Sequence, residues 1–177
     1  MTQITVSLSG LEAVIAQYQG MPRQIQSATT RTIRKTVGWV VTQARRDLAS
    51  EMGVAQSIMR KRLSTKVSGD KGIVWFGLNP FRISKKQFPS LRQTKQGTET
   101  KDLTFPGSFV AKMPNGVIGS FYRIRRARLP IAMDLIPFGG VPAVRQIIAA
   151  QARKAAAHAA EVLAAELNYE INVKGVR

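Results

Sequence analysis

A turn signal between two short apolar runs constrains the fold of this chain more than any other part of it. Pro114, Asn115 and Gly116 separate the runs Ser108–Met113 and Val117–Arg123. Asn-Gly between alternating hydrophobic residues is the strongest local signal for a β-hairpin, because both residues tolerate the positive φ angles of a tight turn. Five basic residues lie beside this turn: Lys112, Arg123, Arg125, Arg126 and Arg128. The sequence therefore predicts a rigid β-unit that presents basic side chains to a partner.

The charge balance points to an anionic partner. The chain has 177 residues, with 27 Lys and Arg against 10 Asp and Glu, and a net charge of +17. Such an excess predicts contact with nucleic acid, an acidic protein surface or an anionic membrane, and it makes an isolated subunit repel itself. The length and a hydrophobic content of 44% favour a single domain over residues 1–177 with a substantial core.

The sequence shows no membrane span or secretory signal. No apolar run approaches the roughly 20 residues that a span requires, and the first residues lack a basic region followed by a long apolar one. The chain has no cysteine, which excludes disulfides, thiolate metal sites and cysteine nucleophiles. We therefore expect a soluble intracellular protein without membrane contacts.

Hydrophobic periodicity predicts two long helices. Apolar residues recur at steps of three and four from Pro22 to about Met52, and an alanine-rich stretch runs over Val144–Leu167 after Pro142. Shorter helices are expected over residues 9–20 and 54–63. Alternation predicts strands at Ile4–Leu8 and at the C-terminus over Tyr169–Val176, and Gly72–Leu78 is also β-like.

This order of elements predicts an α+β fold. We expect a mostly antiparallel sheet on which the long amphipathic N-terminal helix and the alanine-rich C-terminal helix pack. Residues 84–102 are polar, basic and without period, so we expect a protruding loop or arm that is ordered only in an assembly. Its candidate contact residues are Lys85, Lys86, Arg92 and Lys95.

The residues of catalysis and metal binding are sparse. The one histidine, His158, falls inside the alanine-rich helix, where a surface or interface role is expected. Asp47 and Glu51 lie one helical turn apart and suit ion pairs with arginine better than acid–base catalysis. We expect no catalytic residue, no cofactor site and no metal site, and hence no enzyme.

Two clusters of basic residues are the positive signal. Arginine binds carboxylate and phosphate equally well in bidentate fashion, so charge alone does not choose between acidic protein and DNA. The candidate electrostatic interface comprises Arg60, Lys61, Arg62, Arg123, Arg125, Arg126 and Arg128.

An ordered series of short motifs resembles the minor tail protein Z family of tailed bacteriophages, also called tail completion or neck proteins. The series covers nearly the whole chain. In order it comprises Gly10-Leu11-Glu12, Gly53-Val54, Arg60-Lys61-Arg62-Leu63, Pro106-Gly107-Ser108-Phe109-Val110, Asn115-Gly116, Leu129-Pro130-Ile131, Ile136-Pro137 and Val141-Pro142.

The resemblance implies a structural role in the virion, with assembly in the host cytoplasm. Such proteins complete the head-proximal end of the tail and help to join it to the head. The expected partners are copies of the chain in a ring, six-fold by default, with tail terminator, tail tube or head–tail connector proteins and genomic DNA passing through. The alternative is a basic nucleic-acid-binding protein of the ribosomal or architectural kind, which the composition alone would favour.

Overall fold

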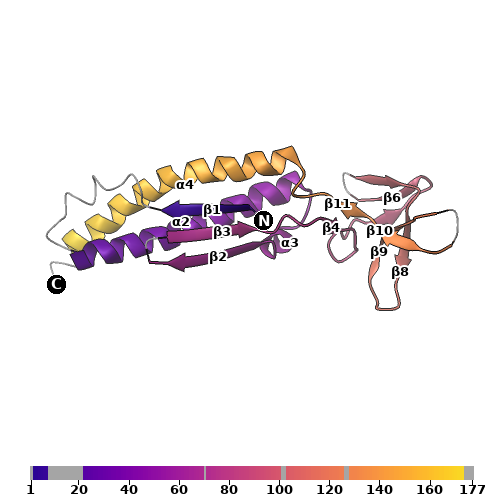
Figure 1. Ribbon diagram of the computed structural model, residues 1–177, viewed down its shortest axis with the longest axis horizontal. Helices are drawn as coiled ribbons and strands as arrows, with labels where there is room; N and C mark the ends of the chain where they lie inside the picture. The colour runs from indigo at the N-terminus through magenta and orange to yellow at the C-terminus, as the bar shows by residue number, and fades with distance from the viewer. Residues whose placement is uncertain (1, 8–21, 70, 101–102, 126–127, 174–177) are drawn as a thin grey trace.

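The chain forms an elongated molecule with two parts (Figure 1). The computed structural model describes residues 2–7, 22–69, 71–100, 103–125 and 128–173. We call residues 2–80 and 137–173 the helix–sheet body and residues 81–136 the β extension. The helix predicted over residues 9–20 lies outside the described residues. No helix among the described residues combines the length and hydrophobicity needed to cross a membrane.

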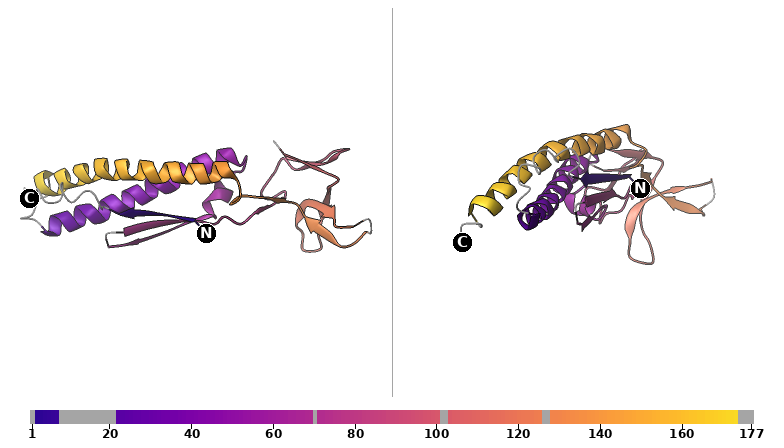
Figure 2. Two further views of the ribbon diagram at one scale, coloured as in Figure 1. Left: turned by 45° about the horizontal axis from the view of Figure 1, so that its top comes forward. Right: turned by 60° about the vertical axis from the view of Figure 1, so that its left-hand side comes forward.

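Two long antiparallel helices form one layer of the body. Helix α2 (Pro22–Glu51) and helix α4 (Pro142–Asn168) were both expected from the sequence. They pack side by side along most of their length (Figures 1 and 2). The rings of Trp39 and His158 stack across this contact with centroids 4.5 Å apart, which places the histidine in a helix interface. Buried Ala155 and Ala159 let the helices approach closely.

A three-stranded antiparallel sheet covers one side of the helices. Its order is β1 (Thr2–Ser7), β3 (Lys71–Phe76), β2 (Leu63–Ser68). Alternate residues of the sheet, such as Ile4 and Val74, are buried against the α2 stripe, which comprises Ile33, Val37, Val40, Ala44 and Leu48. The helix predicted over 54–63 is shorter, α3 (Gln56–Arg60), and the alternating residues that follow it form β2, which was not predicted.

Short antiparallel strands build the β extension. At its root, β4 (Phe81–Arg82) pairs with β11 (Leu135–Ile136). Beyond it, one sheet has the order β10 (Ile131–Met133), β9 (Ile118–Arg123), β8 (Phe109–Lys112). Another has the order β5 (Arg92–Gln93), β6 (Gly97–Glu99), β7 (Thr104–Pro106). The fold class is α+β as expected, although the antiparallel strands form several small sheets.

The predicted hairpin is present, with a different turn from the expected one. Strands β8 and β9 pair with Lys112 opposite Ile118, and the Gly116 amide donates to the Met113 carbonyl at 2.8 Å. Only Gly116 has a positive φ, +80°, whereas Asn115 does not. Pro114 favours the second position of a type I turn, in which neither central residue needs a positive φ angle. Gly116 follows this turn in the left-handed conformation and completes the loop.

Two local expectations were wrong. Residues 84–102 were expected to be structureless outside an assembly, but this segment carries β5 and β6 and buries Phe88 and Leu91. The described part of the expected C-terminal strand is instead a helical continuation, η1 (Tyr169–Val173), and residues 174–176 of that prediction lie outside the described residues. Ile171 packs beside Leu167, and Glu170 pairs with Arg31 of α2, so side-chain contacts keep the segment helical.

Candidate assembly surfaces

The first predicted basic cluster lies at the corner between α3 and β2, and its three residues differ in orientation. Arg60 and Lys61 are exposed. Arg62 instead turns inward: its guanidinium lies 4.7 Å from the ring centroid of Phe81, and its Nη2 donates to the Pro80 carbonyl at 3.1 Å. Arg62 therefore ties the body to the root of the β extension, and the other two residues face solvent.

Two hollows adjoin this corner and share Lys61. One, of about 620 Å³, is also lined by Arg45, Gln56, Ser57 and Arg60. The other, of about 510 Å³, lies where β2 begins and β3 ends. It is lined by Lys61, Arg62, Leu63, Ser64, Trp75, Phe76, Gly77 and Asn79. None of the described residues lining either hollow is acidic. The sequence did not associate Arg45 or Trp75 with this cluster, because they come from α2 and β3.

The second predicted cluster lies on the β extension. Arg123, at the end of β9, places its guanidinium 5.6 Å from the ring centroid of Phe109. Arg125 and Arg128 are exposed in the loop that joins β9 to β10, and Arg126 lies outside the described residues. The two clusters therefore lie on different parts of the molecule and form no single interface.

Large apolar side chains accompany these arginines. Ile124 is 55% exposed and Leu129 67%, beside Tyr122 at 42%. We call residues 122–125 and 128–130 the β9–β10 tip. The sequence predicts the basic cluster but not these exposed apolar residues, because an isolated apolar residue near a strand end is typical of the core.

The candidate arm residues are exposed but differ in charge environment. Lys85, Lys86, Arg92 and Lys95 all face solvent. Arg92 pairs with Glu99 across β5 and β6 at 3.0 Å, which partly neutralises it. The other three have no ion pair among the described residues.

Buried polar groups hold the β extension together. The hydroxyl of Ser120 donates to the Asp134 carboxylate and is hydrogen-bonded to the hydroxyl of Thr98, and all three residues are buried. Backbone hydrogen bonds join the segments around these residues. The Asp134 amide donates to the Ser120 carbonyl at 2.9 Å, and the Ile83 amide donates to the Asp134 carbonyl at 3.0 Å. A buried network with its partners present specifies one strand arrangement.

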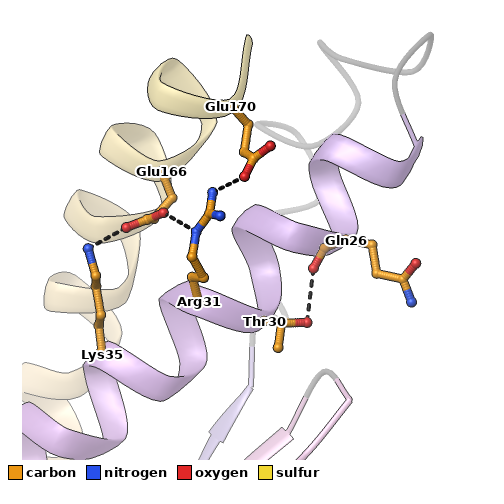
Figure 3. A network of polar contacts seen from close by, with 6 residues as sticks. All are labelled: Gln26, Thr30, Arg31, Lys35, Glu166 and Glu170. Carbon is orange, nitrogen blue, oxygen red and sulfur yellow. Dashed lines mark hydrogen bonds and ion pairs between the residues drawn. The ribbon is translucent and has the colours of Figure 1, made fainter. Parts of the chain in front are cut away.

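A second polar network joins the helices at the end far from the β extension (Figure 3). Arg31 Nε lies 2.6 Å from a carboxylate oxygen of Glu166, and its Nη2 pairs with Glu170. Lys35 also pairs with Glu166. Burial opposes ionisation of Glu166, but its hydrogen bonds with Lys35 and Arg31 outweigh that effect and hold the pKa of Glu166 below its usual 4.5. Since both glutamates are buried, the basic residues of α2 compensate their charge.

An apolar hollow of about 420 Å³ lies where the body meets the β extension. We call it the junction hollow. The last turn of α2 contributes Ser50 and Glu51 to its wall. The remaining lining residues are Met52, Gly53, Phe88, Thr100, Leu103, Ile136, Pro137 and Val141. Glu51 is its one acidic residue among those described, and it has no ion-pair partner in the described part of the chain.

The described part of the chain was also searched for metal ligands. The described residues contain no group of three or more His, Cys, Asp or Glu side chains placed to hold an ion. Comparisons with models of protein families, with curated proteins and with solved structures found no match to this chain.

Proposed function

We propose that this protein is a structural virion protein of a tailed phage, a tail completion or neck subunit that forms a ring between the tail and the head connector. The resemblance of its motifs to minor tail protein Z supports this role. The observation that carries the proposal is the β9–β10 tip, whose apolar and basic side chains are exposed beyond the paired strands β9 and β10. Exposed apolar groups of this kind mark contact sites for other proteins.

The shape of the molecule also suits a ring subunit. The body is compact around two helices, and the β extension projects from one end of it (Figure 2). Contacts from the end of one subunit to the side of the next are heterologous, and they close into a ring when the rotation permits. Acidic tail tube, tail terminator or connector proteins above and below would compensate the charge of +17.

The oligomeric state of the purified full-length protein tests the proposal. Sedimentation velocity should show one discrete oligomer, and negative-stain images should show closed rings. Particles assembled without the protein should accumulate separate heads and tails, and adding it back should join them. A monomer at every concentration, together with normal joining in its absence, would refute the proposal.

The acid-free hollows at the α3–β2 corner favour a second function, nucleic-acid binding. Lysine and arginine contacts to phosphate release counterions, so affinity should fall steeply with salt. Fluorescence anisotropy with labelled duplex and single-stranded DNA measures this slope. Binding that is undetectable or insensitive to salt would exclude this alternative.

A further inference from the structure

The β9–β10 tip is built as a projecting knob. Strands β9 and β10 pair with Arg123 opposite Ile131 and with Phe121 opposite Met133. Just beyond the strands, the Ile124 amide donates to the Pro130 carbonyl at 3.2 Å. The pairing holds the base of the loop, so Ile124 and Leu129 stay in solvent while Arg125 and Arg128 flank them. The tip thus combines apolar surface with positive charge, and no acidic residue lies between Gly116 and Asp134 to offset it.

The junction hollow has the complementary properties. Its wall is mainly apolar, with Met52, Leu103 and Pro137 among the lining residues, and its acidic residue is Glu51. A cavity of about 150 Å³ can hold a benzene molecule, so a hollow of about 420 Å³ has room for aliphatic side chains such as those of the tip. Leu103 itself is 38% exposed, so the hollow leaves apolar surface uncovered.

The tip lies too far from the hollow of its own chain to enter it. The end of β9 and the start of β10 lie in the outer part of the β extension, whereas the last turn of α2 lies at the opposite end of that extension (Figure 1 and Figure 2, left). Only another molecule can bring a tip of this kind to the hollow.

We propose that the β9–β10 tip of one subunit docks in the junction hollow of a second copy, with Ile124 and Leu129 entering the apolar wall and Arg125 and Arg128 facing Glu51. This inference rests on the proposed ring. Each subunit then has one knob and one hollow, so the contact is head-to-tail and can propagate around a closed ring. It also places a tip arginine beside a carboxylate that lacks an ion-pair partner within its own described chain.

Charge-reversal variants test the contact. The tip variant carries Arg125→Glu and Arg128→Glu, and the hollow variant carries Glu51→Lys. Each should weaken assembly by about tenfold or more, because like charges then meet at a partly buried interface. Combining all three changes should restore assembly in part. The control variant, Arg153→Glu with Lys154→Glu, alters charge to the same extent at exposed positions of α4 and should assemble normally.

Mixing the variants gives a sharper readout. The tip variant keeps an intact hollow and the hollow variant keeps an intact tip, so an equimolar mixture can alternate the wild-type contact with the charge-swapped contact. Sedimentation velocity should then show larger oligomers in the mixture than in either variant alone. Apolar variants with unchanged charge, Ile124→Ser and Leu129→Ser, should also reduce assembly while circular dichroism shows an intact fold.

Disulfide trapping measures proximity directly. The chain has no natural cysteine, so Leu129→Cys with Ser50→Cys introduces the only pair. Mild oxidation should produce a ladder of covalent oligomers with the double variant and no ladder with either single variant. If wild-type rings form but the charge-reversal variants assemble normally and the cysteine pair gives no ladder, the docking inference fails and the proposed ring stands. If the wild-type chain forms no oligomer, both fail.

Discussion

At the scale of single residues, the structure separates basic side chains that look equivalent in the sequence. Arg60 and Lys61 face solvent, while Arg62 bonds Pro80 and lies over the ring of Phe81. Arg31 and Lys35 likewise compensate buried carboxylates of another helix. Part of the net charge therefore stabilises the fold, and the remainder is available to partners.

Removing Arg31 should be costly. Arg31→Leu removes the ion pair between Arg31 and the buried Glu170, and it leaves Glu166 with Lys35 as its remaining ion-pair partner among the described residues. Because Arg31 is about one-third exposed and solvent screens the pair, we expect a loss of about 2 kcal/mol in the free energy of unfolding, less than for a fully buried pair. Urea denaturation measures it. Arg34→Leu, on the exposed face of the same helix, should change stability by less than about 0.5 kcal/mol.

The same network should make stability sensitive to acid. The pKa of Glu166 is lowered in the folded chain, so its contribution is present above the unfolded value of 4.5 and is lost as the pH falls through the folded pKa. Thermal unfolding between about pH 6 and about pH 3 should show a smaller fall in Tm for Glu166→Gln than for the wild-type protein. Parallel curves for the two proteins would contradict this assignment.

At the scale of elements, close approach between helix and sheet depends on one glycine. A Cβ at Gly72 of β3 would lie 2.4 Å from Val37 Cγ2 and 2.9 Å from Ile33 Cγ2, both on α2. The side-chain stripe of α2 therefore packs directly on the backbone of the central strand, which explains why a glycine stands inside an otherwise β-branched and aromatic run.

Two glycine-to-alanine substitutions distinguish the effect of side-chain packing on stability from the effect of backbone entropy. Gly72→Ala should destabilise the protein by about 2 kcal/mol, because the added methyl group overlaps the α2 side chains. Gly38→Ala is the control: Gly38 is helical, and a Cβ there meets no atom within 4 Å. That change should stabilise the helix by about 0.5–1 kcal/mol. Guanidinium denaturation of both variants checks the opposite signs.

At the scale of the whole molecule, the β extension is an insertion whose two ends meet. Phe81 lies opposite Ile136 and Arg82 opposite Leu135, so the chain leaves the body and returns to it through paired strands. The body can therefore fold without the extension, whereas the strands of the extension are needed to hold the tip in place.

Excision of the extension tests this division. Replacing residues 84–133 by a short glycine-containing turn should leave a helical, cooperatively unfolding body that no longer self-associates. Some stability will be lost, because Phe88 and Leu91 leave the core cluster that Phe81 and Phe138 share with the body. Circular dichroism and sedimentation velocity report the two properties. A shortened chain that still forms rings would place the assembly contacts in the body.

The sequence by itself determined the features that depend on near neighbours. Periodicity of 3.6 residues predicted α2, alanine content predicted α4, and the Pro114-Asn115-Gly116 turn predicted the hairpin, because these signals act over a few residues. Contacts in the tertiary structure decide which arginines face solvent, why residues 84–100 contain two strands and why Tyr169–Val173 is helical. Those outcomes depend on contacts between distant segments, such as Arg31 with Glu166, which are 135 residues apart. Tertiary packing brings such partners together, and no pattern in the neighbouring sequence indicates the pairing.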